Sequence, residues 1–405
     1  MNLWNRGIIC AIGFVTLTAA ISAAEMPGVT DKEIKIGNTM PYSGPASAYG
    51  TIGKAINAYF NKVNAEGGIN GRSIRFISLD DGYSPPKTKE QIRKLVEKEK
   101  VLLVFQSLGT PTNAAVHSYL NKKRVPQLFV ATGASKWSDP ENFPWTMGWQ
   151  PNYQTEGQIY GSYILKNHPD GKIGILYQND DYGKDYMIGL KKGLGDRSNS
   201  MIVAEESYET TSPTIDSQII KLKASGANIF FNVTTPKFAA QAIKKIFDFN
   251  WKPVHFLNNV SASVGAVLKP AGLEKSQGII SVSYYMDPTD PHYQNTEGMK
   301  RWQKFMADYF PEGNRKESLN MYGYLVAQTM VHVLKKCGDN LTRENVMKHA
   351  ANIRNLKLDT LYEGIEVNTS PSDFRPVESM QPTVFKGESF VPLGEIVKSG
   401  NDKIQ

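Results

Sequence analysis

Paired carboxylates and histidines are the residues of this 405-residue sequence that could most readily support catalysis or metal binding. The pair Asp80-Asp81 ends an apolar stretch, but adjacent residues of a strand point to opposite faces, so the two carboxylates could not readily act together. The histidines show no metal-ligand spacing, and neither a G-x-S-x-G nucleophile motif nor a phosphate-binding P-loop occurs. We therefore expect no enzyme, no metal site and no cofactor. The six histidines are His117, His168, His255, His292, His332 and His349.

A different chemistry is indicated by three loops rich in glycine and hydroxyl residues, at residues 40–50, 106–112 and 131–135. Each loop follows a predicted strand, and ligands of doubly wound α/β folds bind at the carboxyl ends of the strands. A hydroxyl group beside free N–H groups at a helix start is a natural cradle for a carboxylate. Ordinary turn and capping roles remain the alternative for each loop. The residues singled out in these loops are Tyr42, Ser107, Gly109, Thr110, Gly133, Ala134 and Ser135.

The elements that must position these loops form a regular series from residue 34 onward, in which short apolar strands alternate with amphipathic helical stretches. Alternation with short connections predicts parallel strands joined by helical crossovers, which is an α/β fold. The predicted strands of this first series cover residues 34–37, 74–79, 101–105 and 127–130, and the predicted helices cover residues 50–64, 87–99 and 112–122.

The alternation restarts after residues 141–151, which lack periodicity and are rich in Pro, Trp and Asn, as expected for a link. Two similar α/β units predict a two-lobed protein with a cleft between the lobes, and the chain is long enough for two cores. After residue 356 the pattern changes to short strands and turns. The second series has predicted strands at 172–177, 201–205, 228–233, 254–257 and 279–285, and predicted helices at 156–167, 185–194, 213–224, 239–247, 296–309 and 318–336.

The first 24 residues have the pattern of a secretory signal peptide. Arg6 gives a short positive start, an apolar run follows, and Ser22-Ala23-Ala24 places small side chains at a cleavage site. A membrane anchor is the alternative, but the apolar run is too short to span a bilayer of ~30 Å. We expect cleavage after Ala24, an exported soluble protein and a periplasmic location.

The charge and cysteine content argue against two further functions. Loss of Arg6 with the signal leaves 45 Lys and Arg against 39 Asp and Glu, a net charge of +6. The basic residues are scattered among acidic ones, so no nucleic-acid partner is expected. Cleavage also removes Cys10 and leaves Cys337 alone in an apolar stretch, which indicates a buried hydrophobic role.

Several motifs resemble those of the leucine/isoleucine/valine-type periplasmic binding proteins of ABC importers. They are Ser43-Gly44-Pro45-Ala46, Tyr49-Gly50, the stretch from Asn64 to Arg72 (NAEGGINGR), and Asp180-Asp181-Tyr182-Gly183. The resemblance runs from about residue 34 to past residue 324. It implies a type I fold: two Rossmann-like lobes with parallel sheets, joined by three crossovers and closing on ligand at a hinge. It also implies ABC permease subunits as partners and no catalytic activity.

The resemblance also implies domain boundaries. The chain is expected to return to the first lobe near Tyr285 and to the second lobe near Leu361. The N-terminal lobe would then consist of residues 29–150 and 285–360, and the C-terminal lobe of residues 151–284 and 361–405.

Carried over position by position, the resemblance makes Thr110 a carboxylate-binding hydroxyl and Gly133 and Ser135 contacts of the next loop. Tyr182 becomes an aromatic that the second lobe places on the ligand, and Tyr42 part of the pocket wall. Further candidates are Tyr153, Thr234, Asn258 and Asn259, and Trp149, Tyr284 and Tyr285 could add stacking faces.

The sequence departs from the amino-acid binders of the family at one position that matters. Those proteins place an acidic residue after a second-lobe strand to pair with the α-ammonium, but residues 233–236 and 256–261 contain no carboxylate here. A buried ammonium without a counter-charge would be costly. We therefore expect a small carboxylate-bearing ligand without an amine, an aromatic or other non-amine organic acid.

Three alternatives remain open. The protein could be a branched-chain amino-acid binder that uses Asp180 or Asp181 as counter-charge. It could be a sensory binding protein that reports ligand to a membrane receptor, since one fold serves many functions. An enzyme such as an amidase is the third, and the missing nucleophile and base argue against it.

Overall fold

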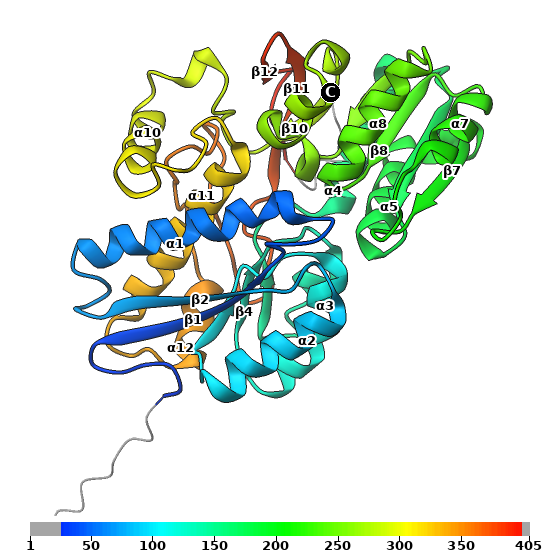
Figure 1. Cartoon of the computed structure of the whole chain (residues 1–405). Coiled ribbons are helices and arrows are strands. Elements are labelled where there is room, and N and C mark those ends of the chain that lie inside the picture. The colour runs from blue at the N-terminus through cyan, green and yellow to red at the C-terminus, as the bar shows by residue number, and fades with distance from the viewer. Residues whose placement is uncertain (1–25, 399–405) are drawn as a thin grey trace, which may run out of the picture.

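The computed structural model describes residues 26–398, which form two α/β lobes, each built around its own sheet (Figure 1). Residues 1–24, with the predicted signal peptide, lie outside the described range. The first sheet has the order β2-β1-β3-β4-β5 and is parallel throughout. Its strands are β1 (Glu33–Met40), β2 (Ser73–Asp80), β3 (Leu103–Phe105), β4 (Gln127–Val130) and β5 (Thr146–Gly148).

The second sheet has the order β12-β11-β10-β9-β8-β6-β7, with β13 beside β11. The strands from β7 to β10 run parallel, and β11 and β12 add an antiparallel hairpin at one edge. The strands are β6 (Ile173–Gln178), β7 (Ile202–Tyr208), β8 (Ile229–Val233), β9 (Val254–Leu257), β10 (Ile280–Ser283), β11 (Ser379–Lys386), β12 (Ser389–Pro392) and β13 (Val397–Lys398).

Helices connect the strands and cover the sheets, as the alternating pattern predicted. The longer ones are α1 (Gly50–Ala65), α2 (Pro85–Arg93), α3 (Thr110–Lys122), α4 (Tyr153–Asn167), α5 (Asp181–Leu194), α7 (Asp216–Ala224), α8 (Pro236–Asp248), α10 (Glu297–Tyr309), α11 (Ser318–Cys337) and α12 (Arg343–Ala350). The shorter ones are α6 (Ser198–Met201) and α9 (Lys269–Ala271). The predicted α/β class with parallel sheets is confirmed.

Two local predictions need correction. Residues 141–151, expected to be an aperiodic link, contain β5, which pairs with β4 at the edge of the first sheet. Three residues are too few to show strand periodicity in a sequence. Helix α5 begins at Asp181, not at residue 185, because the Asp180 side chain accepts hydrogen bonds from the N–H groups of Tyr182 and Gly183 and starts the helix earlier.

The chain passes between the lobes three times. It leaves the first sheet after β5, leaves the second sheet after β10, and returns for β11. Tyr285 and Leu361 pair as an antiparallel bridge where two of these crossovers run side by side. Apolar residues up to Val377 belong to the first core, so the chain stays with that lobe beyond residue 361. The boundaries given above stay a prediction.

Helices α4 and α5 approach each other unusually closely because each presents two glycines at helical spacing. Gly157 and Gly161 lie on α4, and a Cβ atom added to either would sit 2.5 Å from a carbonyl oxygen of α5. Small residues four apart on a helix let a neighbouring backbone come into contact. This pair of helices therefore packs backbone against backbone over two turns.

Replacing Gly161 by alanine should destabilise the protein. In a free helix the change would stabilise by up to about 1 kcal/mol, but here the added methyl group meets the Leu190 carbonyl at 2.5 Å. Overpacking of this kind typically costs about 1–3 kcal/mol. Urea unfolding would measure it, with Lys192→Ala on the exposed face of α5 as control. A Gly161→Ala protein as stable as the wild type would show that the helices can separate without cost.

A buried acid ties α4 to two neighbouring elements. Glu156 accepts hydrogen bonds from the Tyr186 hydroxyl (2.6 Å), the Tyr160 hydroxyl (3.0 Å) and the Asn259 N–H group (2.7 Å). Burial raises the pKa of Glu156 to about 7, although these hydrogen bonds favour the charged form. The folded protein therefore binds the proton of Glu156 more tightly than the unfolded chain does.

The raised pKa of Glu156 leads to a prediction about how the free energy of unfolding depends on pH. The contribution of Glu156 to stability is fully present below its unfolded pKa of about 4.3 and is lost as pH rises through 7, a change on the order of 3 kcal/mol. Glu156→Gln should therefore show a flatter unfolding free energy between pH 5 and pH 8 than the wild type. Glu141→Gln, at an exposed position, serves as control. Parallel pH profiles for wild type and Glu156→Gln would contradict the assignment.

Candidate functional site

A cleft between the two lobes encloses about 880 Å³ of empty space, counting the part that opens to solvent. Tyrosines dominate its wall, together with small apolar side chains. Among the described residues no lysine, arginine or histidine lines the cleft, and its single carboxylate is Asp287. The tyrosines are Tyr49, Tyr83, Tyr153, Tyr182, Tyr284, Tyr285, Tyr322 and Tyr362.

The first lobe contributes the start of α3. Gly109 and Thr110 line the cleft, and no side chain caps this helix; because Pro111 has no N–H group, Thr110 and Thr112 supply the N–H groups of its first residues. The Thr110 hydroxyl lies 2.6 Å from that of Thr132. Because the Thr132 oxygen already receives N–H groups from Ala134 and Trp137, its own proton is best donated to Thr110. This leaves the Thr110 proton free for an acceptor in the cleft.

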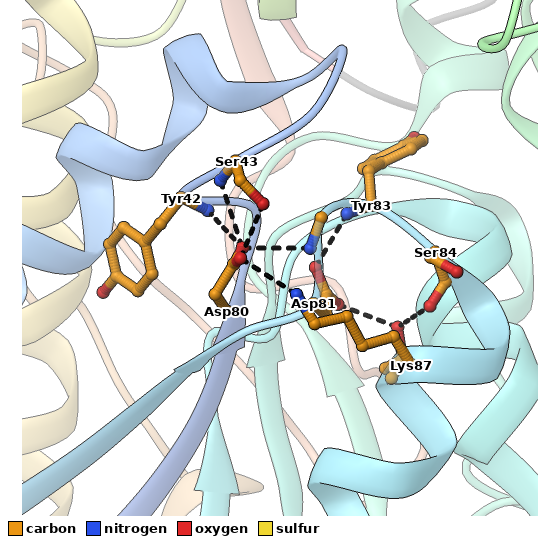
Figure 2. A network of polar contacts seen from close by, with 9 residues as sticks. Tyr42, Ser43, Asp80, Asp81, Tyr83, Ser84 and Lys87 are labelled. Carbon is orange, nitrogen blue, oxygen red and sulfur yellow. Dashed lines mark hydrogen bonds and ion pairs between the residues drawn. The ribbon is translucent and has the colours of Figure 1, made fainter.

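Asp80 and Asp81 build the turn that carries Tyr83 into the cleft (Figure 2). Asp81 accepts the N–H group of Tyr83 at 3.0 Å, and Tyr83 has a left-handed φ of 60°. Such a conformation is costly for a large side chain and persists only where neighbours hold it. Tyr83 was not among the predicted site residues, because nothing in an aspartate pair indicates which later residue the turn presents.

Asp80 holds the neighbouring loop in place. It accepts hydrogen bonds from the N–H groups of Tyr42 and Ser43, from the Ser43 hydroxyl at 2.6 Å and from Lys87 at 3.0 Å (Figure 2). These donors outweigh the partial burial of the group and keep the pKa of Asp80 well below its usual range. Asp80 and Asp81 bind different partners, as expected for adjacent strand residues, and both are structural.

The second lobe contributes Tyr182 from the first turn of α5. Its ring packs against Tyr153 and Tyr186, at centroid distances of 5.2 and 5.6 Å. The side chain is 3% exposed, and its hydroxyl has no hydrogen-bond partner among the described residues. A buried hydroxyl without a partner is costly, and this one faces the cavity. It is therefore available to a ligand.

Asn259 and Thr235 complete the second-lobe side of the cleft. Asn259 is fixed by the Glu156 carboxylate and by the Val282 carbonyl, which its side-chain amide contacts at 2.6 Å. Thr235 precedes α8, which likewise begins without a side-chain cap. The neighbouring Asn258 is buried beneath them and donates to the carbonyls of Asn232 and Thr234.

Several contacts join the lobes around the cleft, including the ion pair of Lys136 with Asp181 at 2.6 Å and a hydrogen bond from the Gln178 side chain to the Tyr83 hydroxyl at 3.4 Å. The Tyr49 hydroxyl donates to the Val260 carbonyl at 3.1 Å, the Ser263 hydroxyl donates to Glu317 at 2.6 Å, and Ser135 donates through its N–H group (2.6 Å) and hydroxyl (3.0 Å) to Asp185. Each pairs a residue of one lobe with a residue of the other. The structure is thus in a closed arrangement.

Of the twelve predicted site residues, the structure brings five to the cleft. These are Gly109, Thr110, Tyr153, Tyr182 and Asn259. Another seven do not line it: Tyr42, Ser107, Gly133, Ala134, Ser135, Thr234 and Asn258.

Hydrogen bonds within the protein, or packing in a core, hold five of these seven residues away from the cleft. The Tyr42 hydroxyl pairs with Ser78 at 2.6 Å behind the loop, and the Ser107 hydroxyl accepts the Thr39 N–H group. Gly133 gives its carbonyl to Tyr153, and Ala134 packs in a core. The Thr234 hydroxyl donates to Asn232 at 2.6 Å.

The two acids considered as counter-charges for an amine do not reach the cleft. Asp180 caps α5, and Asp181 pairs with Lys136 at 2.6 Å. Asp287, from the crossover after β10, lines the cleft instead. Its carboxylate accepts the N–H group and hydroxyl of Thr289 (2.8 and 2.7 Å) and the N–H group of Phe390 (3.0 Å). Burial raises its pKa.

Other reactive groups have structural roles. His117 stacks on Phe143 at 3.8 Å between ring centroids, His255 is buried, and Cys337 is a buried free thiol. Within residues 26–398 no cluster of three or more His, Cys, Asp or Glu side chains could hold a metal ion. In the same range, no helix combines the length and apolar character needed to cross a membrane.

Comparison with known proteins agrees with this architecture. The sequence profile described as "Periplasmic binding protein" matches residues 33–388. The Leu/Ile/Val-binding protein homolog 2 of Brucella abortus (strain 2308) is 24% identical over 344 residues, which cover 83% of this chain and 85% of that protein.

Solved structures show the same fold at low identity. A branched chain amino acid ABC transporter protein from Thermus thermophilus with bound valine has a TM-score of 0.82 at 17% identity, covering 92% of this chain and 98% of that one. A fatty acid ABC transporter substrate-binding protein from Thermomonospora curvata has a TM-score of 0.75 at 21% identity, covering 92% and 94%. With its two lobes, interlobe cleft and matched profile, this chain belongs to the periplasmic binding protein family.

Proposed function

We propose that the protein captures a small carboxylic acid without an amine group and delivers it to the permease of an ABC importer. The observation that carries this proposal is the composition of the cleft. It offers N–H and hydroxyl donors at the start of α3, whereas among the described residues no cationic side chain lines it and its single carboxylate, Asp287, already accepts three hydrogen bonds.

A carboxylate fits the first-lobe side of the cleft. The uncapped start of α3 supplies N–H groups and the positive end of the helix dipole, which together favour an anion. The free proton of Thr110 adds a charge-assisted hydrogen bond. Glycine at position 109 lets the Tyr83 ring pack closely against the start of α3. A Cβ atom there would lie 2.5 Å from that ring, and the φ of 103° suits glycine.

An ammonium fits less well. The loops of residues 233–236 and 256–261 contain no carboxylate, and the oxygens of Asp287 already receive three hydrogen bonds from Thr289 and Phe390. The tyrosine wall favours an apolar or aromatic body, because tyrosine rings combine large contact faces with polar tips.

An amino-acid ligand is the second candidate. The names of the Brucella and Thermus relatives refer to branched-chain amino acids, whereas the Thermomonospora relative is named for fatty acids, which carry a carboxylate and no amine. Asp287 is the residue that would have to serve an ammonium. A sensory role remains a further possibility for the same fold.

Transport requires export and hinge motion, and both belong to this proposal. Cleavage after Ala24 would release the protein into the periplasm. Closure would bring Tyr182 and Asn259 of the second lobe onto an acid already held at Thr110, and the closed surface is the one a permease would recognise.

Calorimetry with a ligand panel tests the ligand class. Benzoates, phenylpropanoates and medium-chain fatty acids should bind more tightly than valine and leucine, because only the amino acids must bury an ammonium. The primary amides of the same acids serve as controls, since they lack the negative charge. Tight leucine binding without binding of any non-amine acid would overturn the proposed ligand class.

Thr110→Ala should weaken binding of the acid by roughly 1–3 kcal/mol through loss of one charge-assisted hydrogen bond. Thr110→Ser keeps the hydroxyl group and should retain most of the affinity. The dissociation constants of both variants would be measured by calorimetry, together with their melting temperatures. Unchanged affinity in Thr110→Ala would remove this residue from the site.

A further inference from the structure

The cleft extends well beyond the start of α3, along the edge of the second sheet. Its wall includes Tyr182 after β6, Thr235 after β8, Asn259 after β9, Ser283 at the end of β10, Thr383 on β11 and Phe390 on β12. These strands are consecutive neighbours in the sheet. Because its lining comes from six adjacent strands, the cleft is an elongated groove along the edge of the sheet.

Two buried hydroxyl groups mark points along this groove. Tyr182 and Tyr362 are 3% and 5% exposed, both line the cleft, and neither hydroxyl has a hydrogen-bond partner among the described residues. Tyr362 is held beside the end of β10 by its N–H group, which donates to the Tyr284 carbonyl at 3.2 Å. Three strand spacings separate β6 from β10, which corresponds to roughly 14 Å.

We propose that the ligand is elongated and carries a hydroxyl group at the end opposite its carboxylate, which binds between Tyr362 and Asp287. This inference rests on the proposed function, because it takes the carboxylate to lie at Thr110. It deepens that function by giving the acid a second polar end and an apolar body long enough to reach it.

The chemistry of the far end favours a hydrogen-bond donor. Asp287 accepts three hydrogen bonds, whereas a carboxylate offers about four lone-pair sites, so it can take one more donor. The hydroxyl of Tyr362 can donate or accept. A ligand hydroxyl would satisfy both, donating to Asp287 and accepting from Tyr362.

A hydroxyl suits this end better than an ammonium does. An ammonium brings three donors and a full charge that is costly to bury, whereas Asp287 already accepts three hydrogen bonds and has room for one more donor. A neutral donor carries no such charge. Apolar contacts from Phe390 and Val282 would hold the body of the ligand between the two ends.

Matched ligands test the inference on the wild-type protein. Calorimetry would compare 3-phenylpropanoate, its 4-hydroxy derivative and its 4-methoxy derivative, and likewise decanoate and 10-hydroxydecanoate. The two series differ in length, and in the series whose length matches the groove the hydroxylated acid should bind roughly three- to tenfold more tightly than the plain acid, the value of one buried hydrogen bond. The methoxy derivative should lose that advantage, because it has no proton to donate.

Tyr362→Phe locates the effect. It should bring the affinity ratio of the hydroxylated and plain acids close to one, because only the hydroxylated acid would form a hydrogen bond with the Tyr362 hydroxyl. Tyr293→Phe is the matched control, because Tyr293 packs against Tyr362 at 5.7 Å between ring centroids but does not line the cleft. The control should keep the wild-type ratio.

The possible failures are distinguishable. If plain and hydroxylated acids bind the wild type equally in both pairs, or if Tyr362→Phe keeps the full ratio, the distal hydroxyl site is overturned while the acid-binding function stands. An ω-amino acid that binds more tightly than the ω-hydroxy acid would also overturn it. If no acid of the panel binds but leucine does, the proposed function fails and the inference fails with it.

Discussion

A carboxylate enclosed between two lobes must exchange its water for donors that the protein supplies, and in this cleft those donors are neutral. Within the described residues no lysine, arginine or histidine faces the cavity. Removing a charge from water costs several kcal/mol unless hydrogen bonds replace the lost hydration. The uncapped start of α3, the Thr110 hydroxyl and the tyrosine hydroxyls are the groups that can do so. Much of the structure around the cleft holds these donors in position.

Carboxylates of the protein do much of this placing from outside the cavity. Asp81 holds the turn of Tyr83, Asp180 starts the helix of Tyr182, and Glu156 fixes the backbone of Asn259. Each acid accepts backbone N–H groups instead of meeting the ligand. These carboxylates thus stabilise the backbone next to the cleft, and the groups that line the cleft are oriented hydroxyl and amide groups.

Strand and helix periodicity allowed the fold class and most elements to be predicted, and the glycine and hydroxyl loops indicated where a ligand would lie. Gly109, Thr110 and Tyr182 could be predicted to line the cleft because each lies where a helix begins after a strand of its sheet. Asp287 and Tyr362 could not be found in this way, since both lie in irregular crossovers that meet only in the folded protein. Ser135 was predicted to belong to the site, but it lies where the two lobes meet, because it donates a hydrogen bond to Asp185, fifty residues away in the sequence.

The three crossovers also constrain how the chain can fold. The first core draws on residues from Ile34 to Trp149 and again from Tyr284 to Val377, and the second sheet gains β11 and β12 only from residue 379 onward. Neither core is therefore built from one continuous segment of the chain. Contacts of such long sequence separation form slowly. Completion of the two lobes is thereby coupled, because the residues up to Val377 complete the first core and β11 and β12, directly after them, complete the second sheet.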